Sequence, residues 1–156
     1  MFEHRVKIHT ETDMLRLGQG VSDICTGIET LALMGDIGAG KSVFSRGCIA
    51  NLLPQPEDIP SPTFTIIQQY NGIDFDILHC DLYRLSDISE TDELGLWDAM
   101  GQALCLIEWP EILEHHLPQD SLRITITPHK DDTRTVTFSG PAPIWRDKIE
   151  HICNAI

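Results

Sequence analysis

The order of apolar and polar residues along this chain follows two kinds of pattern. Residues 30–34 and 103–108 form short, nearly continuous apolar runs, which are typical of strands buried on both faces of a sheet. Elsewhere apolar residues recur at helical spacing or polar residues dominate a helix-length stretch, which predicts helices at 10–25, 42–53, 87–101 and 143–153. Buried strands that alternate with helices indicate an α/β protein.

Two further pairs of strands are predicted around turn signals. Residues 63–70 and 75–83 flank Asn71–Gly72, a strong hairpin dipeptide, and a second hairpin is predicted from strands 123–127 and 135–139. The stretch 5–9 predicts an edge strand. We therefore expect a mixed sheet with a parallel core, antiparallel hairpins and helices on both faces. A chain of 156 residues is expected to form one domain, 1–156.

Local signals mark where several of these elements begin and end. Thr10 is a candidate N-cap, with Asp13 at the capping-box position that Glu or Gln usually fills. Pro54 is expected to end the second helix, and Pro143 lies near the first turn of the last one.

Charge and composition narrow the function classes. The chain has 24 acidic and 11 basic side chains, a net charge of −13, which argues against direct binding to nucleic acid or to an anionic membrane. No apolar run approaches a membrane span, and the N-terminus has no signal-peptide pattern. The five cysteines are widely spaced and odd in number, which favours a reduced cytoplasmic protein with buried thiols and argues against a zinc site.

One motif carries most of the chemistry. Residues 35–42, "GDIGAGKS", fit the P-loop pattern G-x-x-x-x-G-K-[ST]. Glycines allow the backbone N–H groups to form a nest for phosphate, and the following helix turns its positive end toward the same place. The predicted phosphate-binding set is Gly35, Asp36, Ile37, Gly38, Ala39, Gly40, Lys41 and Ser42. Lys41 would reach the β- and γ-phosphates of a nucleotide, and the Ser42 hydroxyl would bind Mg²⁺. The alternative, an ordinary glycine turn, is weakened because a buried strand precedes the motif and a helix follows it.

A P-loop enzyme also needs acids for Mg²⁺ and for water. Glu108 and Asp81 each end a buried-strand candidate, as such acids do. We prefer Glu108 as the metal ligand, because its strand resembles a partner of the P-loop strand; Asp81 would hold metal-bound water or the attacking water. Either could approach the metal, and an ordinary surface carboxylate is the alternative for both.

Two other positions are open to more than one interpretation. A threonine in "SPTFT", residues 61–65, either senses the γ-phosphate or Mg²⁺ as switch threonines do, or serves as a turn residue. Trp109 either packs on a nucleotide or partner, or is an ordinary aromatic residue at a strand end. "DELG" at 92–95 fits a GTPase D-x-x-G, but no N-K-x-D follows, so ATP is the expected nucleotide.

Several stretches in order resemble one family. "GDIGAGKS", "SPTFT", "HCDLYRL" at 79–85, "ELGL" at 93–96 and "LIEWPE" at 106–111 resemble the TsaE family, small bacterial P-loop ATPases of tRNA threonylcarbamoyladenosine biosynthesis. The resemblance covers roughly 10–118. It implies a P-loop NTPase fold with ATP and Mg²⁺, and a cytoplasmic protein that acts with the partner proteins TsaB and TsaD. Together these proteins support the modification of adenosine 37 in tRNAs that read codons beginning with A. The resemblance thus implies that this chain meets tRNA indirectly, through the complex with its partners.

The resemblance also assigns roles to individual residues. It implies that Lys41 and Ser42 bind phosphate and Mg²⁺, although Thr is usual in the family where this chain has Ser42. It implies that Asp81 is the essential acid. It also implies that Glu108 is the acid that binds the metal, with Trp109 as the neighbouring tryptophan. Thr63 matches the S-P-T-F threonine, and Thr10 to Thr12 lie where the N-terminal segment of the family approaches the nucleotide.

Two other functions compete with an ATPase subunit. One is a nucleotide-gated binding module whose own turnover is incidental, which would use the same residues. The other is a small-molecule kinase, which needs an arginine-rich lid; the arginines beyond the P-loop helix, Arg84, Arg123, Arg134 and Arg146, do not cluster in the sequence.

Overall fold

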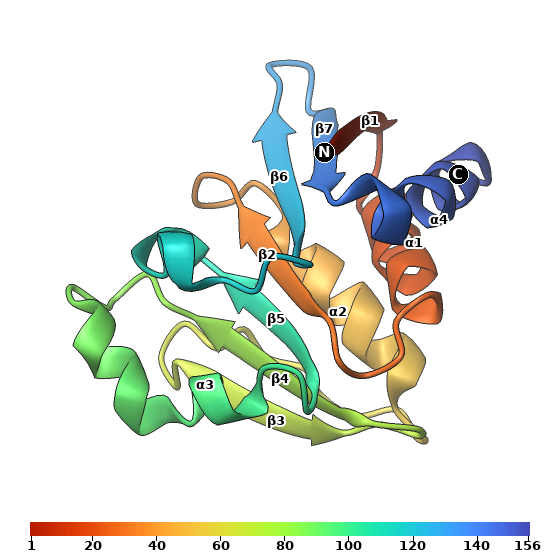
Figure 1. Ribbon diagram of the computed structural model, residues 1–156. Helices are drawn as coiled ribbons and strands as arrows, with labels where there is room; N and C mark the ends of the chain where they lie inside the picture. Colours follow the sequence, from red (N-terminus) through yellow and green to blue (C-terminus); the bar gives the residue numbers. More distant parts are fainter.

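The computed structural model describes residues 1–156, except for the side chain of Glu114. Its strands are β1 (Phe2–Ile8), β2 (Thr30–Met34), β3 (Ile67–Asn71), β4 (Asp76–Asp81), β5 (Leu104–Glu108), β6 (Leu122–Pro128) and β7 (Arg134–Gly140). Its α-helices are α1 (Glu11–Asp23), α2 (Lys41–Leu52), α3 (Leu96–Ala99) and α4 (Ala142–Asn154). Three 3-10 helices complete it: η1 (Ile88–Leu94), η2 (Pro110–Ile112) and η3 (Glu114–His116). Figure 1 shows their arrangement.

The strands form one mixed sheet in the order β1-β7-β6-β2-β5-β4-β3. Strands β6, β2, β5 and β4 are parallel and form its centre. The pairs β3–β4, β6–β7 and β1–β7 are antiparallel and extend both sides. This arrangement confirms the predicted α/β fold with a parallel core and antiparallel hairpins, including the expected edge strand at the N-terminus.

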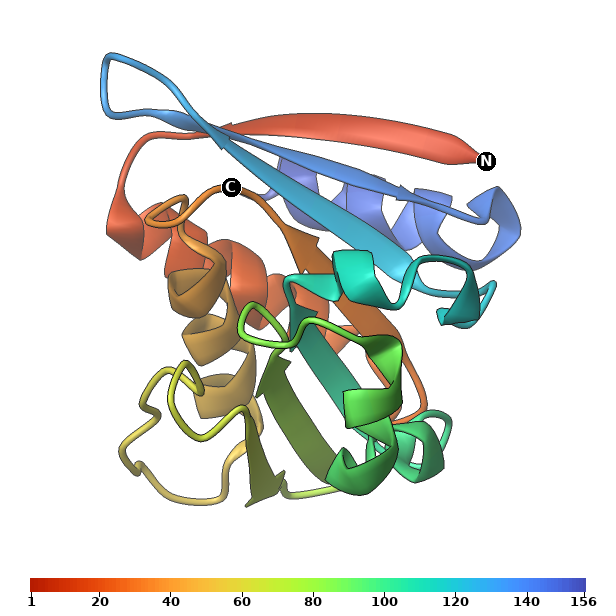
Figure 2. The same ribbon diagram turned by 90° about the vertical axis from the view of Figure 1, so that its left-hand side faces the viewer.

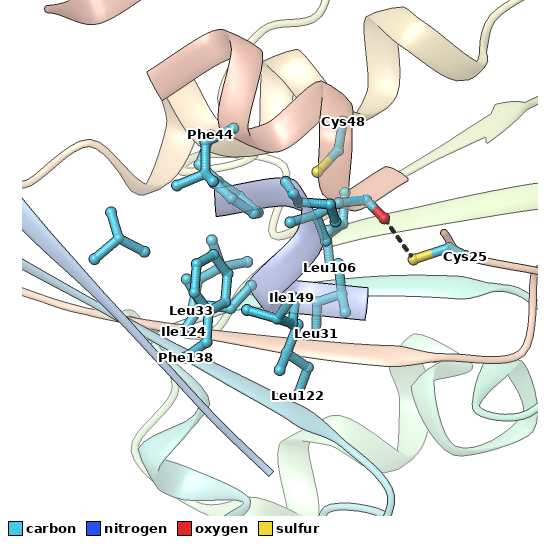
Figure 3. Close-up of a cluster of buried hydrophobic side chains, with 14 of the residues drawn as sticks. Cys25, Leu31, Leu33, Phe44, Cys48, Leu106, Leu122, Ile124, Phe138 and Ile149 are labelled. Carbon is cyan, nitrogen blue, oxygen red and sulfur yellow. Dashed lines mark hydrogen bonds between the residues drawn. The ribbon is translucent and has the colours of Figure 1, made fainter. Parts of the chain in front are cut away.

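Helices cover both faces of the sheet, as expected. Helices α1, α2 and α4 lie on one face, where their apolar side chains meet those of the central strands in the larger core (Figures 1 and 3). Leu31, Leu33 and Leu106 from the sheet pack there with Phe44 and Cys48 of α2. The short helices η1, α3, η2 and η3 cover the other face over β4 and β5 (Figure 2).

Two glycines allow helices α1 and α2 to pack closely. A Cβ atom at Gly18 would lie 2.3 Å from the carbonyl oxygen of Phe44, and one at Gly47 would lie 2.3 Å from that of Leu15. Each helix therefore presents a glycine to the backbone of the other. This contact holds the P-loop helix α2 against α1.

Several predicted boundaries are confirmed. Thr10 caps α1, because its Oγ1 accepts a hydrogen bond from the Asp13 N–H at 3.1 Å. Helix α2 ends at Leu52, two residues before Pro54, and Pro143 is the second residue of α4. The five cysteines are buried thiols. In the described part of the chain, a helix with the length and apolar character of a membrane span is absent.

Two predicted elements need correction. The strand predicted at 63–70 begins only at Ile67, because a turn comes first: Ile66 donates its N–H to the Pro62 carbonyl at 2.7 Å and has a φ of +69°. The helix predicted at 87–101 is instead the 3-10 helix η1 followed by the single-turn helix α3. Gly95 separates them in the left-handed conformation, at φ +74°, which breaks the helical path.

Candidate functional site

The P-loop connects the carboxyl end of β2 to the start of α2. Gly35, Gly38 and Gly40 have φ angles of +146°, +81° and +120°, which residues with a Cβ rarely adopt. A Cβ at Gly35 would also lie 2.6 Å from the carbonyl oxygen of Ile126. The Phe44 N–H donates a hydrogen bond to the Gly40 carbonyl at 3.0 Å, as in the first turn of a helix. The N–H groups that come before it in that turn have no acceptor within the helix. The loop thus has the backbone shape and the helix end that bind phosphate.

Lys41 lies buried at the centre of this loop. Its Nζ donates hydrogen bonds to the carbonyl oxygens of Gly35 and, at 3.0 Å, Asp36. It also lies 4.2 Å from the centre of the Trp109 ring, within the range of a cation–π contact. Burial lowers the pKa of Lys41, while the nearby carboxylates, Glu108 first among them, act in the opposite direction. A buried ammonium ion held by loop carbonyls can exchange these acceptors for phosphate oxygens.

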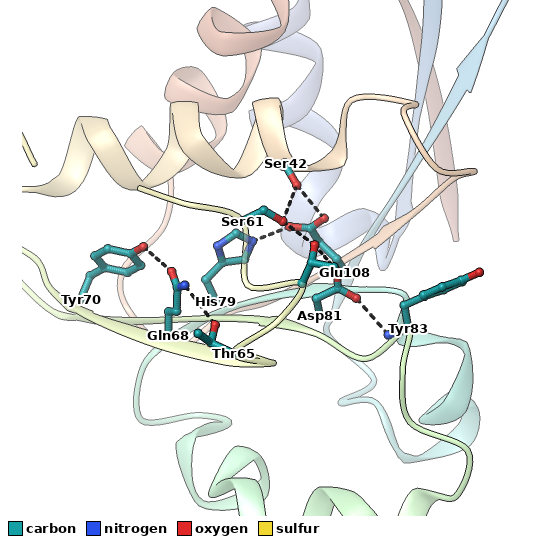
Figure 4. A network of polar contacts seen from close by, with 10 residues as sticks. Ser42, Ser61, Thr65, Gln68, Tyr70, His79, Asp81, Tyr83 and Glu108 are labelled. Atoms are coloured by element: carbon teal, nitrogen blue, oxygen red, sulfur yellow. Dashed lines mark hydrogen bonds and ion pairs between the residues drawn. The ribbon is translucent and has the colours of Figure 1, made fainter. Parts of the chain in front are cut away.

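Asp81 and Glu108 lie side by side at the carboxyl ends of β4 and β5, where the register pairs them directly. Their residues are 6% and 2% exposed. Glu108 Oε1 accepts a hydrogen bond from Ser42 Oγ at 3.2 Å. Asp81 Oδ2 accepts one from Thr63 Oγ1 at 3.4 Å, and its Oδ1 accepts the Tyr83 N–H at 2.9 Å (Figure 4). Glu108 therefore faces the P-loop helix, and Asp81 faces the 61–65 loop.

Trp109 covers the site from the end of β5. Its backbone is left-handed, with φ and ψ of 57°, which is an outlier for a bulky residue. Its N–H donates to the Leu33 carbonyl at 3.2 Å, and its ring lies 4.7 Å from that of Tyr83. The strained backbone places the indole over Lys41 instead of along the strand.

These side chains line one open cavity of about 330 Å³. The predicted residues that it brings together are Ile37, Gly38, Gly40, Lys41, Ser42, Thr63, Asp81, Glu108 and Trp109. Burial also raises the pKa of Glu111, which lies near Lys41. The cavity offers a cation, two carboxylates and a hydroxyl within one small volume.

Thr10 lies in a different cavity. This second space of about 260 Å³ lies beside the same loop and shares Gly38, Gly40 and Val43 with the first. Its other lining residues come from the end of β1, from the start of α1 and from β7, and include Thr10, Met14 and Arg134. The P-loop backbone thus separates the cavity of the acids from the one that Thr10 joins.

Arg134 and His79 also belong to this region, and neither is predicted from the sequence as a site residue. Arg134 Nε donates to the Ala39 carbonyl at 2.7 Å from the start of β7, where no sequence signal links it to the P-loop. His79 Nε2 lies 2.5 Å from Glu108 Oε2. A signal existed for His79, because it lies two residues before Asp81 and strand alternation puts both on one face.

The donor set of the acid cavity suits Mg²⁺. Ser42, Asp81 and Glu108 offer hard oxygen atoms, which Mg²⁺ prefers, and Mg²⁺ usually takes one or two carboxylates together with phosphate oxygens. Within the residues that the structure describes, no group of three or more His, Cys, Asp or Glu could hold a metal ion. A site that completes its coordination with phosphate and water fits these residues better than an all-protein cage.

Comparison with known proteins gives a consistent result. Residues 8–136 match the model of the family described as threonylcarbamoyl adenosine biosynthesis protein TsaE. The chain is 43% identical over 113 residues to the tRNA threonylcarbamoyladenosine biosynthesis protein TsaE of Bacillus subtilis, covering 72% of this chain and 70% of that one. It is 32% identical over 153 residues to the protein of the same description from Haemophilus influenzae, covering 94% and 96% of the two chains.

A solved structure extends the similarity to the fold. The crystal structure of Bacillus subtilis YdiB superposes on this chain with a TM-score of 0.79 at 28% sequence identity, covering 99% of this chain and 96% of that one. The similarity therefore includes the C-terminal helix and nearly all of the N-terminal strand, of which only Ile8 lies inside the matched family region.

Proposed function

The chain belongs to the TsaE family and is a tRNA threonylcarbamoyladenosine biosynthesis protein, and from this we propose that it is the ATP-binding and ATP-hydrolysing subunit of that pathway. It would act in the cytoplasm with TsaD and TsaB, as one P-loop ATPase domain spanning 1–156, in the threonylcarbamoylation of adenosine 37. The tRNAs concerned read codons that begin with A, and this chain would meet them through the complex.

One observation carries the ATPase proposal. Lys41, Ser42, Asp81 and Glu108, which lie up to 67 positions apart in the sequence, line a single cavity at the mouth of the P-loop. A phosphate cradle beside two buried carboxylates and a hydroxyl is the arrangement that phosphoryl transfer to water requires. A glycine turn without a nucleotide would not need two carboxylates buried next to a lysine.

Each residue has a task in this proposal. The N–H groups of the P-loop and of the first turn of α2 would bind the phosphates, and Lys41 would leave the Gly35 and Asp36 carbonyls to meet them. Ser42 and Glu108 would hold Mg²⁺, with Asp81 binding it directly or through water that it also orients. Mg²⁺ would neutralise charge that develops on the phosphate oxygens. Thr63, joined to Asp81, would couple the 61–65 loop to the bound phosphate.

The second cavity is suited to the nucleoside. It opens on the other side of Gly38 and Gly40 and combines apolar side chains, such as Met14, with the polar groups of Thr10 and Arg134. A nucleotide whose phosphates occupy the P-loop would extend into this space. This placement gives Thr10 a role near the sugar or the base and keeps the acids for the phosphates.

A nucleotide-gated binding module is the second candidate, and one contact favours it. Lys41 is satisfied by carbonyls of its own loop, so the loop has a stable arrangement before ATP binds. Binding would then change the loop and Trp109 together, whatever the rate of hydrolysis. Both functions use the same residues, and they differ in whether turnover is required.

Reconstitution separates the two. The assay combines TsaB, TsaD, threonylcarbamoyl-adenylate and tRNA, with wild-type protein, with Lys41→Ala and without this protein, and measures modified adenosine and released phosphate. We expect several rounds of modification per TsaD only with the wild-type protein and ATP. Equal modification with a non-hydrolysable ATP analogue would favour the binding module. Equal modification without this chain would refute both.

A further inference from the structure

His79 lies inside the protein, behind the pair of carboxylates. It is 1% exposed and stands on β4, two residues before Asp81, on the sheet face that α2 covers. Its Nε2 is 2.5 Å from Glu108 Oε2, and the dashed line in Figure 4 marks this contact. Glu108 is therefore bound on both of its oxygens, by His79 on Oε2 and by Ser42 on Oε1.

The direction of this hydrogen bond follows from the chemistry of its partners. An ionised carboxylate accepts hydrogen bonds and cannot donate them, so Nε2 of His79 carries the hydrogen. The opposite ring atom, Nδ1, is buried and has no hydrogen-bond partner among the residues that the structure describes. An N–H at Nδ1 would leave a buried donor unsatisfied, which costs more than a buried lone pair there. The tautomer with hydrogen on Nε2 therefore fits this site best, because it makes the bond to Glu108 and leaves only a lone pair unpaired at Nδ1.

Packing alone does not call for a histidine at this place. Ile77, two residues earlier on the same face of β4, is an apolar residue buried to 1% exposure. A leucine or methionine at 79 would continue that face without leaving a buried nitrogen unpaired. The imidazole therefore serves the carboxylate that it touches.

We propose that His79 is a positioning residue for the metal site, which holds Glu108 Oε2 so that Oε1 is directed at Ser42 and at Mg²⁺. This inference rests on the proposed function, because it needs Glu108 to be a metal ligand. Groups that hydrogen-bond to a metal ligand fix its orientation, and their loss commonly weakens metal affinity about 10- to 100-fold. His79 would thus limit Glu108 to one oxygen for the metal.

The test uses two variants of His79 whose side-chain amides lie at different distances from the backbone. In His79→Gln the amide nitrogen can occupy the place of Nε2 and still donate to Glu108, whereas in His79→Asn it lies near the place of Nδ1 and falls short. Mn²⁺ affinity is measured by electron paramagnetic resonance with ADP bound, and ADP affinity is measured separately without metal. We expect His79→Asn to weaken Mn²⁺ binding about tenfold or more and His79→Gln to retain most of it, with metal-free ADP affinity unchanged in both.

A double-mutant comparison excludes a merely structural effect. In a Glu108→Gln background, His79→Asn should cause little further loss of Mn²⁺ affinity, because the ligand that His79 positions is already changed. A further loss of the same size as in the wild type would overturn the proposal. Equal Mn²⁺ affinities for His79→Asn and the wild type would overturn it as well. If Glu108→Gln alone leaves Mn²⁺ affinity unchanged, the metal role of Glu108 in the proposed function fails.

The wild-type protein supplies a test that needs no variant to fold. Long-range ¹H–¹⁵N spectra of the imidazole distinguish the two neutral tautomers of a histidine. We expect the metal-free protein to show His79 with hydrogen on Nε2. Hydrogen on Nδ1 alone would mean that His79 cannot donate to Glu108, and it would overturn the proposal.

Discussion

Arg134 donates a hydrogen bond from Nε to the carbonyl oxygen of Ala39, with the two atoms 2.7 Å apart and the two residues 95 positions apart in the chain. Its Nη2 reaches the neighbouring carbonyl of Gly38 at 3.4 Å. Both carbonyl groups belong to the P-loop, and Arg134 reaches them from the start of β7. The guanidinium group, which is pre-organised as a planar fork, thus holds the P-loop to β7.

Loss of this support should weaken nucleotide binding. We expect Arg134→Met to lower ADP affinity about five- to tenfold, since a hydrogen bond from a charged group contributes about 1.5–3 kcal/mol and this one is partly exposed. Arg134→Lys should fall between Met and the wild type, because an ammonium group cannot bridge both carbonyls in one plane. Calorimetry measures both affinities.

The matched control is Arg5→Met, which removes the same charge from the exposed edge strand β1. It should bind ADP as the wild type does. An Arg134→Met affinity equal to that of Arg5→Met would show that the Arg134 contacts do not support the loop.

Lys41 should increase the rate of ATP hydrolysis and lower the stability of the folded protein at pH 7. We expect Lys41→Met to reduce ATP hydrolysis by at least about 10²-fold, because it removes the positive group that meets the transferred phosphate. Burial lowers the pKa of Lys41 in the fold, so the folded protein binds this proton less tightly than the unfolded chain does. Lys41→Met should therefore melt at a higher temperature than the wild type at pH 7.

The expected pH dependence of this destabilisation follows from the lowered pKa of Lys41. The destabilisation is present at pH values below the folded-state pKa of Lys41. It disappears as the pH rises past the usual lysine pKa of about 10.4, where both states are neutral. The difference in melting temperature between Lys41→Met and the wild type should narrow between pH 7 and pH 11. A Lys41→Met protein that melts below the wild type at pH 7 would contradict the argument.

The two carboxylates should differ in their Mg²⁺ dependence. Glu108 Oε1 is joined to the P-loop hydroxyl of Ser42, whereas Asp81 is joined to Thr63 and to the Tyr83 backbone. We expect both Glu108→Gln and Asp81→Asn to cut hydrolysis strongly, and Glu108→Gln to need the greater increase in Mg²⁺. Phosphate release measured over a Mg²⁺ titration gives both quantities, and a larger shift for Asp81→Asn would transfer the main metal role to Asp81.

The close contact between α1 and α2 should not tolerate a methyl group. In Gly47→Ala the new Cβ would lie 2.3 Å from the Leu15 carbonyl oxygen, which is backbone and cannot move alone. We expect a loss of about 1–3 kcal/mol in the free energy of unfolding, although alanine is the better helix former. Denaturant titration measures it.

Gly20→Ala is the control in the neighbouring helix. Its Cβ would meet the end of the Ile152 side chain at 2.7 Å, and a side chain can rotate away. Gly20→Ala should therefore cost much less than Gly47→Ala. Equal effects would mean that the helices adjust freely and that their close approach is not required.

The backbone of Trp109 should favour glycine over alanine. At φ 57° a Cβ is strained by about 1–2 kcal/mol, and glycine avoids that strain. We expect Trp109→Gly to be more stable than Trp109→Ala by about 1 kcal/mol, whereas an alanine variant is usually more stable than a glycine variant. Ala50→Gly, on the exposed side of α2, should show the usual order, with glycine the less stable residue. A Trp109→Ala protein more stable than Trp109→Gly would show that the left-handed backbone is not maintained.

The sequence by itself predicts the sheet type, the P-loop and the two strand-end acids. These features depend on residues that are close in the chain: the eight residues of the motif set their own backbone, and the short apolar run 30–34, which ends at the first glycine of the motif, is typical of a buried strand. The acids follow because parallel strands place their carboxyl ends at one edge of the sheet. The roles assigned to these residues stay predictions until the experiments above are done.

The tertiary structure alone decides which distant groups meet. Ile66 turns where the pattern predicts a strand, because its N–H bonds to the Pro62 carbonyl and the pairing of β3 with β4 begins only at Ile67. The contacts of Arg134 with Ala39 and of His79 with Glu108 join segments that are 95 and 29 positions apart. Their geometry depends on strand register and on the packing of α2, which act over the whole fold and leave no local pattern in the sequence.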